Sequence, residues 1–225
     1  LVVIPLSFYL SEKQTEIRSA PNDIKNYLQT PKIAISGRQL QFFLGLAGVG
    51  CCIAMAMPQV HIVAYCVGLG YGPTIGAEML SLMLACGVIS RISFGICADR
   101  LGGFYTLILS STLQMLSLFL FLPFNGMVSL YVVSAIFGLS QGGIVPSYTI
   151  VVREFLPAHE AGQRIGIVLM LTIFGMAIGG WMSGWIFDQT GSYQIAFLNG
   201  ILWNVFNLAI LVWLFMRLRK VYAAT

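Results

Sequence analysis

The sequence predicts an all-α polytopic membrane protein with six transmembrane helices, and three observations support this fold class. Of the 225 residues, 58% are hydrophobic and only 9% are charged, whereas a soluble domain carries about 25% charged residues. The chain holds six apolar segments, each long enough to cross roughly 30 Å of hydrocarbon. Apart from Arg91, all Lys and Arg residues lie outside these segments.

The part of the chain before the six segments divides in two. Residues 1–10 are apolar but lack the basic start of a signal peptide, and we interpret them as the end of a preceding transmembrane helix. Residues 11–38 are rich in Lys and Arg and contain Pro21 and Pro31. They are expected to form a hydrophilic basic linker.

The six-helix transmembrane bundle is expected over residues 39–216. Glycine and proline clusters separate its helices, because these residues interrupt helices and favour turns. The first helix either ends near Val60 or continues past Pro58 to Val67. The predicted helices occupy about 39–60, 74–98, 104–122, 127–152, 165–187 and 193–216, and a tail follows at 217–225.

The cations predict the orientation of the bundle. Connections that hold Arg100, Arg153 and Arg164 alternate with connections that hold no Lys or Arg. Cytoplasmic loops of membrane proteins carry the excess of Lys and Arg. The linker, the turn at Arg100 and the tail at 217–225 are therefore expected in the cytoplasm, and the protein in the cell (inner) membrane.

Several classes of function are disfavoured. The net charge of +4 is too scattered for a nucleic-acid-binding surface. The five cysteines show neither a C-x-x-C pair nor a Cys/His metal spacing, so no metal or other cofactor is expected. The chain also lacks an H-E-x-x-H motif and paired aspartates within its apolar segments, so we do not expect an enzyme.

Small residues recur at helical spacing in two segments. Gly175, Gly179 and Ser183 are four residues apart, and Gly138 and Gly142 have the same spacing. Helix interfaces within membranes are enriched in small residues, which let backbones approach closely. We expect close helix crossings at both places, although glycine is also simply frequent in membrane helices.

The second segment carries an unusual charge. Arg91 lies within the apolar run, and Gly95-x-x-x-Asp99-Arg100-x-Gly102 follows it. A guanidinium at the centre of a membrane helix costs at least about 2.5–3.5 kcal/mol on insertion scales. That cost suggests a function for Arg91, and the alternative is that its side chain extends to the cytoplasmic surface.

These motifs and the topology resemble the C-terminal half of a major facilitator superfamily transporter. The resemblance covers nearly the whole chain and rests on stretches 91–103, 138–146, 179–180 and 188–193. Within the superfamily the chain looks similar to bacterial relatives of monocarboxylate transporters and oxalate–formate exchangers. The resemblance implies alternating-access transport of a small organic anion, a missing N-terminal six-helix half as partner in the same chain, and the lipid bilayer as surroundings. A proton is a candidate coupling ion.

The resemblance also implies roles for individual residues. Gly95, Asp99, Arg100 and Gly102 would form a conformational latch on the cytoplasmic side. The alternative for Asp99 and Arg100 is a solvated loop pair of little energetic value. The sequence departs from the family pattern at Gly103, where relatives usually have a basic residue.

Arg91 matches an arginine that binds the substrate carboxylate in carboxylate-transporting relatives. A planar guanidinium can bind a carboxylate through two parallel hydrogen bonds. An aspartate of some relatives is replaced by Gly87, and a lysine of the oxalate exchanger by about Thr172. A monoanion therefore fits better than a dicarboxylate.

Other polar residues within the apolar segments complete the candidate site. Gln141, Tyr148 and Thr172 are candidate substrate-binding residues, and interhelical hydrogen bonding is their alternative role. Glu78 is a candidate coupling group, or else the hydrated end of a helix. Two alternatives to anion transport remain, namely a carrier for another metabolite or drug and a membrane scaffold or receptor without transport activity.

Overall fold

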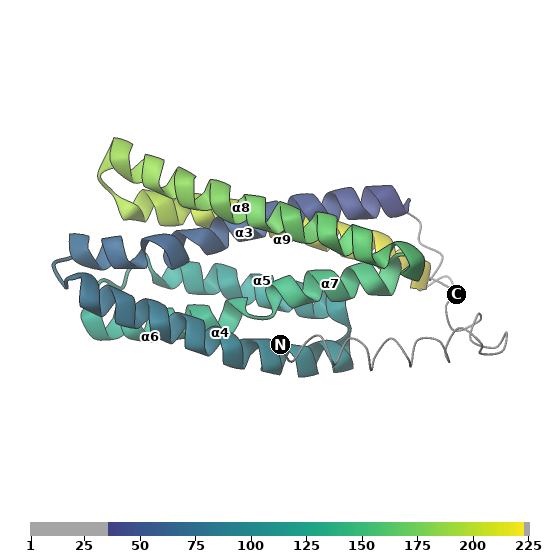
Figure 1. Ribbon diagram of the computed structural model, residues 1–225, viewed down its shortest axis with the longest axis horizontal. Helices are drawn as coiled ribbons and strands as arrows, with labels where there is room; N and C mark the ends of the chain where they lie inside the picture. Colours follow the sequence, from purple (N-terminus) through teal and green to yellow (C-terminus); the bar gives the residue numbers. More distant parts are fainter. Residues whose placement is uncertain (1–35, 223–225) are drawn as a thin grey trace, which may run out of the picture. The chain divides into compact units, whose positions relative to one another are not determined.

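The computed structural model describes residues 36–222, which form a bundle of long helices (Figure 1). The predicted helix end at 1–10 and the linker as far as residue 35 lie outside the described residues. Within them, six stretches are long and apolar enough to cross a membrane, and there is no strand. The predicted fold class is confirmed. The helices are α3 (Gly37–Gly68), α4 (Pro73–Leu101), α5 (Gly103–Leu120), α6 (Met127–Gln141), α7 (Ile144–Phe155), α8 (Ala161–Thr190) and α9 (Tyr193–Tyr222).

Three of the six spans differ from the simplest expectation. The first, α3, continues through Pro58 to Gly68. The fourth apolar segment is divided into α6 and α7 at Gly142 and Gly143. The last helix extends to Tyr222, so most of the predicted tail 217–225 is helical.

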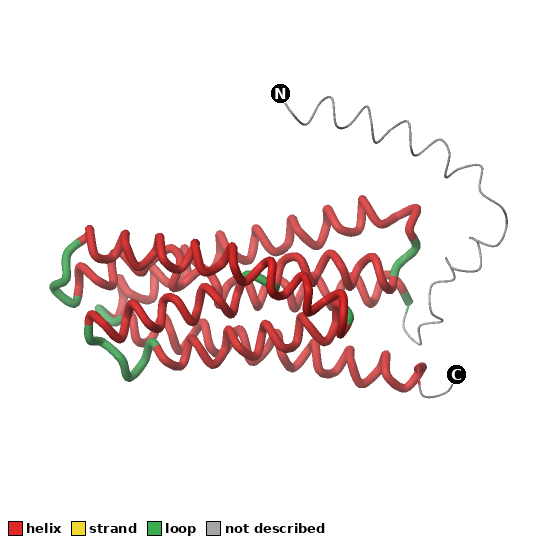
Figure 2. Tube along the Cα trace, turned by 90° about the horizontal axis from the view of Figure 1, so that it is seen from below, coloured by secondary structure: helices red, strands yellow, loops and turns green. Residues whose placement is uncertain are grey.

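Glycines allow the sharp turns between helices. Gly102 joins α4 directly to α5 with a φ of 85°. Residues that have a Cβ rarely adopt this backbone conformation. Gly191 ends α8 in the left-handed conformation, with a φ of 66° and its N–H donated to the Phe187 carbonyl. Such a C-terminal glycine satisfies one of the helix's free carbonyl groups. The connections are therefore short, and consecutive membrane spans run in opposite directions, with α6 and α7 together forming one span (Figure 2).

The helices pack as two interleaved triplets. The first triplet is α3, α4 and α5, and the second consists of the α6–α7 pair, α8 and α9. The first helix of each triplet packs on the second and third helices of the other: α3 lies against α8 and α9, and α6–α7 lies against α4 and α5. In Figure 1, α4, α7 and α8 lie nearer the viewer, and the fainter α5 lies behind them.

Both predicted small-residue crossings are confirmed. A Cβ on Gly175 would lie 2.6 Å from the Val49 carbonyl oxygen, and one on Gly179 would lie 2.5 Å from that of Ile53. A Cβ on Gly138 would overlap the backbone of Met83 in the same way. Backbones are therefore in direct contact where α8 crosses α3 and where α6 crosses α4.

Burial is uneven among the helices. In their most apolar windows, α3 buries 72% of its residues, whereas α4 and α8 bury only 17% and 22%. The exposed side chains are nevertheless apolar, including Ile92 at 65% and Trp181 at 70% exposure. Apolar side chains on the outside match a hydrocarbon surrounding. The protein is a multi-pass membrane protein, and α4 and α8 have the most surface left for lipid or further protein.

Candidate substrate-binding site

Arg91 lies on α4 with its side chain exposed on the surface of the bundle. Ion pairs among the described side chains join Glu160 to His159 and to Arg164, and Arg91 takes part in none. An exposed guanidinium on a helix that buries little of its surface is available to a group outside the bundle.

Gln141, the last residue of α6, binds a residue that the sequence analysis did not identify. Gln59 of α3 donates its side-chain N–H to the Gln141 amide oxygen, with an Nε2–Oε1 distance of 2.7 Å. Gln141 is only 5% exposed, and Gln59 is half-buried. We refer to Gln59 and Gln141 as the amide pair.

Gln141 of the amide pair lies close to Gly87 of α4, one helical turn before Arg91. The place of a Cβ on Gly87 of α4 is 4.0 Å from Gln141 Nε2. Arg91 follows Gly87 by four residues, and such residues lie on one face of a helix with their Cβ atoms about 5–6 Å apart. The Cα–Cβ bonds of a helix tilt toward its N-terminus, so the Arg91 side chain starts out toward Gly87. Gln141 thus lies close to Gly87, one helical turn from Arg91 on α4.

Tyr148 and Thr172 lie elsewhere, inside the bundle. The Tyr148 hydroxyl donates to Asn207 Oδ1 at 3.0 Å, and the residue is fully buried. The Thr172 hydroxyl donates to the Leu169 carbonyl of its own helix at 2.7 Å. Both side chains approach Gly48 of α3, since its Cβ position is 3.0 Å from Thr172 Cγ2 and 3.7 Å from Tyr148 Cζ. Their predicted substrate-binding role would require the bundle to open.

Glu78 lies near the start of α4 and is exposed. Tyr131 of α6 donates its hydroxyl to Glu78 Oε2. This bond joins α4 to α6 near the end of the bundle opposite Arg100. Nothing else among the described residues links Glu78 to the surroundings of Arg91, so its coupling role stays a prediction.

Of the four predicted latch residues, Asp99, Arg100 and Gly102 lie at the α4–α5 turn, and Gly95 lies within α4. Asp99 and Arg100 are exposed, and neither forms an ion pair among the described side chains. The link to a neighbouring helix comes instead from Glu154 of α7, whose Oε1 accepts the backbone N–H of Gly103 at 2.8 Å. A carboxylate at this position accepts one of the free N–H groups at the start of α5 and complements the helix dipole.

The packing at this turn explains the glycine at position 103. A Cβ there would lie 2.6 Å from Ile150 Cγ2 and 3.2 Å from Glu154 Oε2. A larger residue would push α5 away from α7 and disturb the hydrogen bond from Glu154. The departure from the family pattern thus accompanies a closer contact between these two helices.

A second polar cluster joins α3 to α8 at the end of the bundle that carries Arg38, Arg100 and Arg164, which we call the basic end. Arg164 Nε donates to Glu160 Oε2 at 2.7 Å, and its Nη1 donates to Gln41 Oε1 at 2.7 Å. The hydrogen bond and charge of Arg164 lower the pKa of Glu160. Arg164 is largely occupied by these contacts, unlike Arg91.

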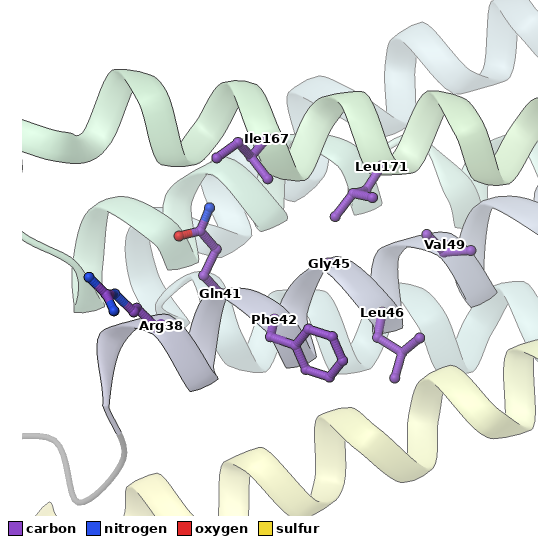
Figure 3. Close-up of a pocket in the computed structure, with 8 residues that line it drawn as sticks. All are labelled: Arg38, Gln41, Phe42, Gly45, Leu46, Val49, Ile167 and Leu171. Carbon is purple, nitrogen blue, oxygen red and sulfur yellow. The ribbon is translucent and has the colours of Figure 1, made fainter.

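A groove of about 310 Å³ lies between α3 and α8 near the basic end (Figure 3). Figure 3 shows Arg38 and Gln41 at one end of it and the apolar side chains of Phe42, Leu46 and Leu171 along it. Neither Arg91 nor the amide pair lines this groove. It is a separate feature from the candidate substrate-binding site.

Two contacts in these sites were missed by sequence reasoning. Gln59 directly follows Pro58, as Gln141 directly precedes Gly142, so a polar residue beside a helix interruption was the available signal. Glu154 gave no comparable signal because its partner is a backbone N–H. Within the described residues no group of three His, Cys, Asp or Glu side chains could hold a metal ion.

Comparison with known proteins defines the family. The family model described as Major Facilitator Superfamily matches residues 42–224, most of the chain. The chain belongs to this superfamily. The crystal structure of the peptide transporter POT (E310Q mutant) in complex with sulfate superposes with a TM-score of 0.68 at 18% identity, over 76% of this chain and 37% of that chain. At that identity the similarity supports the fold alone.

Curated relatives carry the names of anion transporters. Monocarboxylate transporter 13 of Rattus norvegicus is 29% identical over 144 residues, which are 63% of this chain and 34% of the relative. A gallate transporter of Pseudomonas putida is 28% identical over 133 residues, 59% of this chain and 28% of the relative. The chain therefore spans about a third of the length of the relatives it matches.

Proposed function

We propose that this chain is one six-helix half of a secondary transporter that moves small organic monoanions, with Arg91 binding the carboxylate. The observation that carries this proposal is the exposed Arg91, which has no ion-pair partner among the described side chains. The names of the relatives, a monocarboxylate transporter and a gallate transporter, support an anion as substrate. Transport rather than catalysis fits the family.

The geometry favours binding of one carboxylate. An arginine on an apolar helix can form two parallel charge-assisted hydrogen bonds to a carboxylate. In a site with little water this attraction is stronger than in bulk solvent. The other cations of α4 and α7 are Arg100 and Arg153, and both lie at the basic end, away from Arg91. Neither α6 nor the second half of α3 contains a Lys or Arg. A monoanion needs only one cation to bind its carboxylate.

The complete site requires a second half of the transporter. Substrate sites in this superfamily lie near the bilayer midplane between two six-helix halves, and rocking of the halves gives alternating access. The exposed surfaces of α4 and α8 are available for that contact.

We also propose that the bundle spans the inner membrane with its basic end facing the cytoplasm. Asp99 and Arg100 would then pair with the second half, and Glu78 with Tyr131 is the candidate proton-coupling pair.

The test is uptake by the full-length protein in proteoliposomes, with L-lactate, pyruvate, benzoate and gallate as labelled probes. Arg91→Gln should reduce uptake of the transported anions by at least about 100-fold, since it removes a charge-assisted pair. Arg91→Lys keeps the charge but loses the planar geometry, and should retain an intermediate rate. Arg153→Gln, an exposed cation at the basic end, is the matched control and should transport normally.

Folding and function are separated by measuring the thermal stability of each variant. An Arg91→Gln protein that is as stable as the parent but does not transport supports direct binding. Unchanged uptake of every transported anion by Arg91→Gln would overturn the role of Arg91. If the parent protein moves none of a broad panel of organic anions, the transport proposal itself fails, and a scaffold or receptor becomes the better reading.

A further inference from the structure

The amide pair lies at two corresponding interruptions of the helices. Pro58 removes one backbone hydrogen bond of α3, the first helix of its triplet, without ending the helix, and Gln59 follows it. Gly142 and Gly143 interrupt the first helix of the other triplet, and Gln141 precedes them. Helix interruptions in corresponding positions of structural repeats are the best sequence indicator of a transporter's binding site. A hydrogen bond of 2.7 Å then joins the two interruptions.

The amide pair has hydrogen-bonding groups to spare. With Gln59 Nε2 donating to Gln141 Oε1, the free groups are the acceptor Gln59 Oε1 and the donor Gln141 Nε2. If both amides were turned over, one acceptor and one donor would still remain. The buried side-chain polar atoms without a partner in the described part of the chain belong to four other residues, Ser111, Ser134, Asn199 and Asn204. The free groups of the amide pair are not among these fully buried atoms.

Arg91 and Gln141 both lie near Gly87 of α4. Gln141 Nε2 lies 4.0 Å from the Cβ position of Gly87, and Arg91 stands one turn further along that face of α4. Gly87 has no side chain to fill the interval between them. A small molecule could thus contact the guanidinium at one end and the amides at the other.

We propose that the amide pair recognises a hydroxyl group, so that the substrate class is a small hydroxycarboxylate. A hydroxyl donates one hydrogen bond and accepts others, which matches the acceptor and donor that remain free in either arrangement of the amides. The carboxylate would bind Arg91. This inference rests on the proposed function, and it adds a group that distinguishes hydroxylated acids from their deoxy counterparts.

A carboxylate without the hydroxyl would fit less well. It would remove water from Gln59 Oε1 and Gln141 Nε2 without replacing the hydrogen bonds. A site built to bind a hydroxyl rejects the analogue that lacks it, because its polar groups are left unpaired. The partly exposed amides can retain some water, so we expect a discrimination of about tenfold or more rather than the much larger values of closed sites.

The experiment compares matched pairs of acids with the full-length protein in proteoliposomes. The pairs are L-lactate and propionate, 3-hydroxybutyrate and butyrate, mandelate and phenylacetate, and 4-hydroxybenzoate and benzoate. For the parent protein, kcat/KM should be at least about tenfold higher for the hydroxy acid in one or more pairs. Gln59→Met and Gln141→Met, which keep side-chain length but remove the amide, should each reduce that ratio toward one.

The ratio of two substrates in one variant does not depend on how much protein folds. Gln194→Met, which changes an exposed glutamine at the start of α9, is the matched control and should keep the parent ratio. If the parent shows no preference for hydroxy acids, or if the Gln59 and Gln141 variants keep it, the inference is overturned.

Failure of the inference can be told apart from failure of the proposed function. Carboxylates that are transported in an Arg91-dependent way but without hydroxyl preference overturn only the role of the amide pair. The absence of any carboxylate transport, or transport that does not need Arg91, overturns the proposed function and the inference with it.

Discussion

Two groups of polar side chains in this bundle differ in what surrounds them. Tyr148, Asn207 and Asn204 form an interior cluster, in which each side chain is fully buried and the hydroxyl of Tyr148 binds Asn207. Arg91 is exposed, and the amide pair, with Gln59 half-buried and Gln141 nearly buried, keeps hydrogen-bonding groups that have no partner among the described residues. Polar residues of a membrane helix thus divide into those that hold helices together and those that are available to a solute. Burial of the individual atoms distinguishes the two kinds.

The largest difference is expected for a variant of the interior cluster. Asn207→Leu leaves the buried Tyr148 hydroxyl without its acceptor, and we expect a loss of about 1–2 kcal/mol in the free energy of unfolding. Thermal unfolding of the purified full-length protein measures it. Gln59→Met should cost less than about 0.5 kcal/mol, because water can hydrate the Gln141 amide that remains. Equal losses in both variants would contradict the distinction.

Removing a surface contact to a backbone N–H should reduce the free energy of unfolding by an amount between those expected for Asn207→Leu and Gln59→Met. Glu154→Ala removes the carboxylate that accepts the Gly103 N–H at the start of α5. By analogy with N-terminal caps, we expect a loss of about 0.5–1 kcal/mol. Glu154→Gln keeps an acceptor and should recover most of it. A full loss in the Gln variant would mean that the charge, rather than the hydrogen bond, provides the stability.

The smallest effect should be the pH dependence of the cluster at Arg164. Its hydrogen bond and charge lower the pKa of Glu160 below the ordinary value of 4.5. A lowered carboxylate pKa stabilises the folded state above the unfolded-state value, and this contribution disappears as the pH falls through the lowered one. Unfolding temperatures should therefore differ less between Glu160→Gln and the parent at pH 3 than at pH 7. A constant difference across this range would contradict the assignment.

The sequence was sufficient for the architecture. Segment length, the absence of charge within segments and the alternation of cations predict six membrane-crossing helices, and these properties depend on the chain alone. The crossings at Gly175, Gly179 and Gly138 were also predictable, because only small residues permit such close backbones. The positions of these helix crossings therefore follow from the spacing of small residues within one segment, which can be read from the sequence.

The site was less predictable, because burial depends on how a helix is turned against its neighbours. Arg91 was identified from its desolvation cost, a property of the residue and its segment. Tyr148 and Thr172 were equally polar, yet their hydroxyls already have partners inside the bundle. Gln59 was missed since its interaction with Gln141 joins residues far apart in the chain. A polar residue next to Pro58 was the only local indication.

The interleaving of the two triplets has a consequence for how the chain is made. α3 buries most of its surface against α8 and α9, whose sequences begin only at Ala161 and Tyr193. During synthesis α3 enters the membrane long before these partners exist, so the glycines that later touch α8 must first face lipid or another protein. A ribosome that stopped before Ala161 would leave α3 in the membrane without the two helices that cover most of it. Quality control by membrane chaperones and proteases would act during this interval.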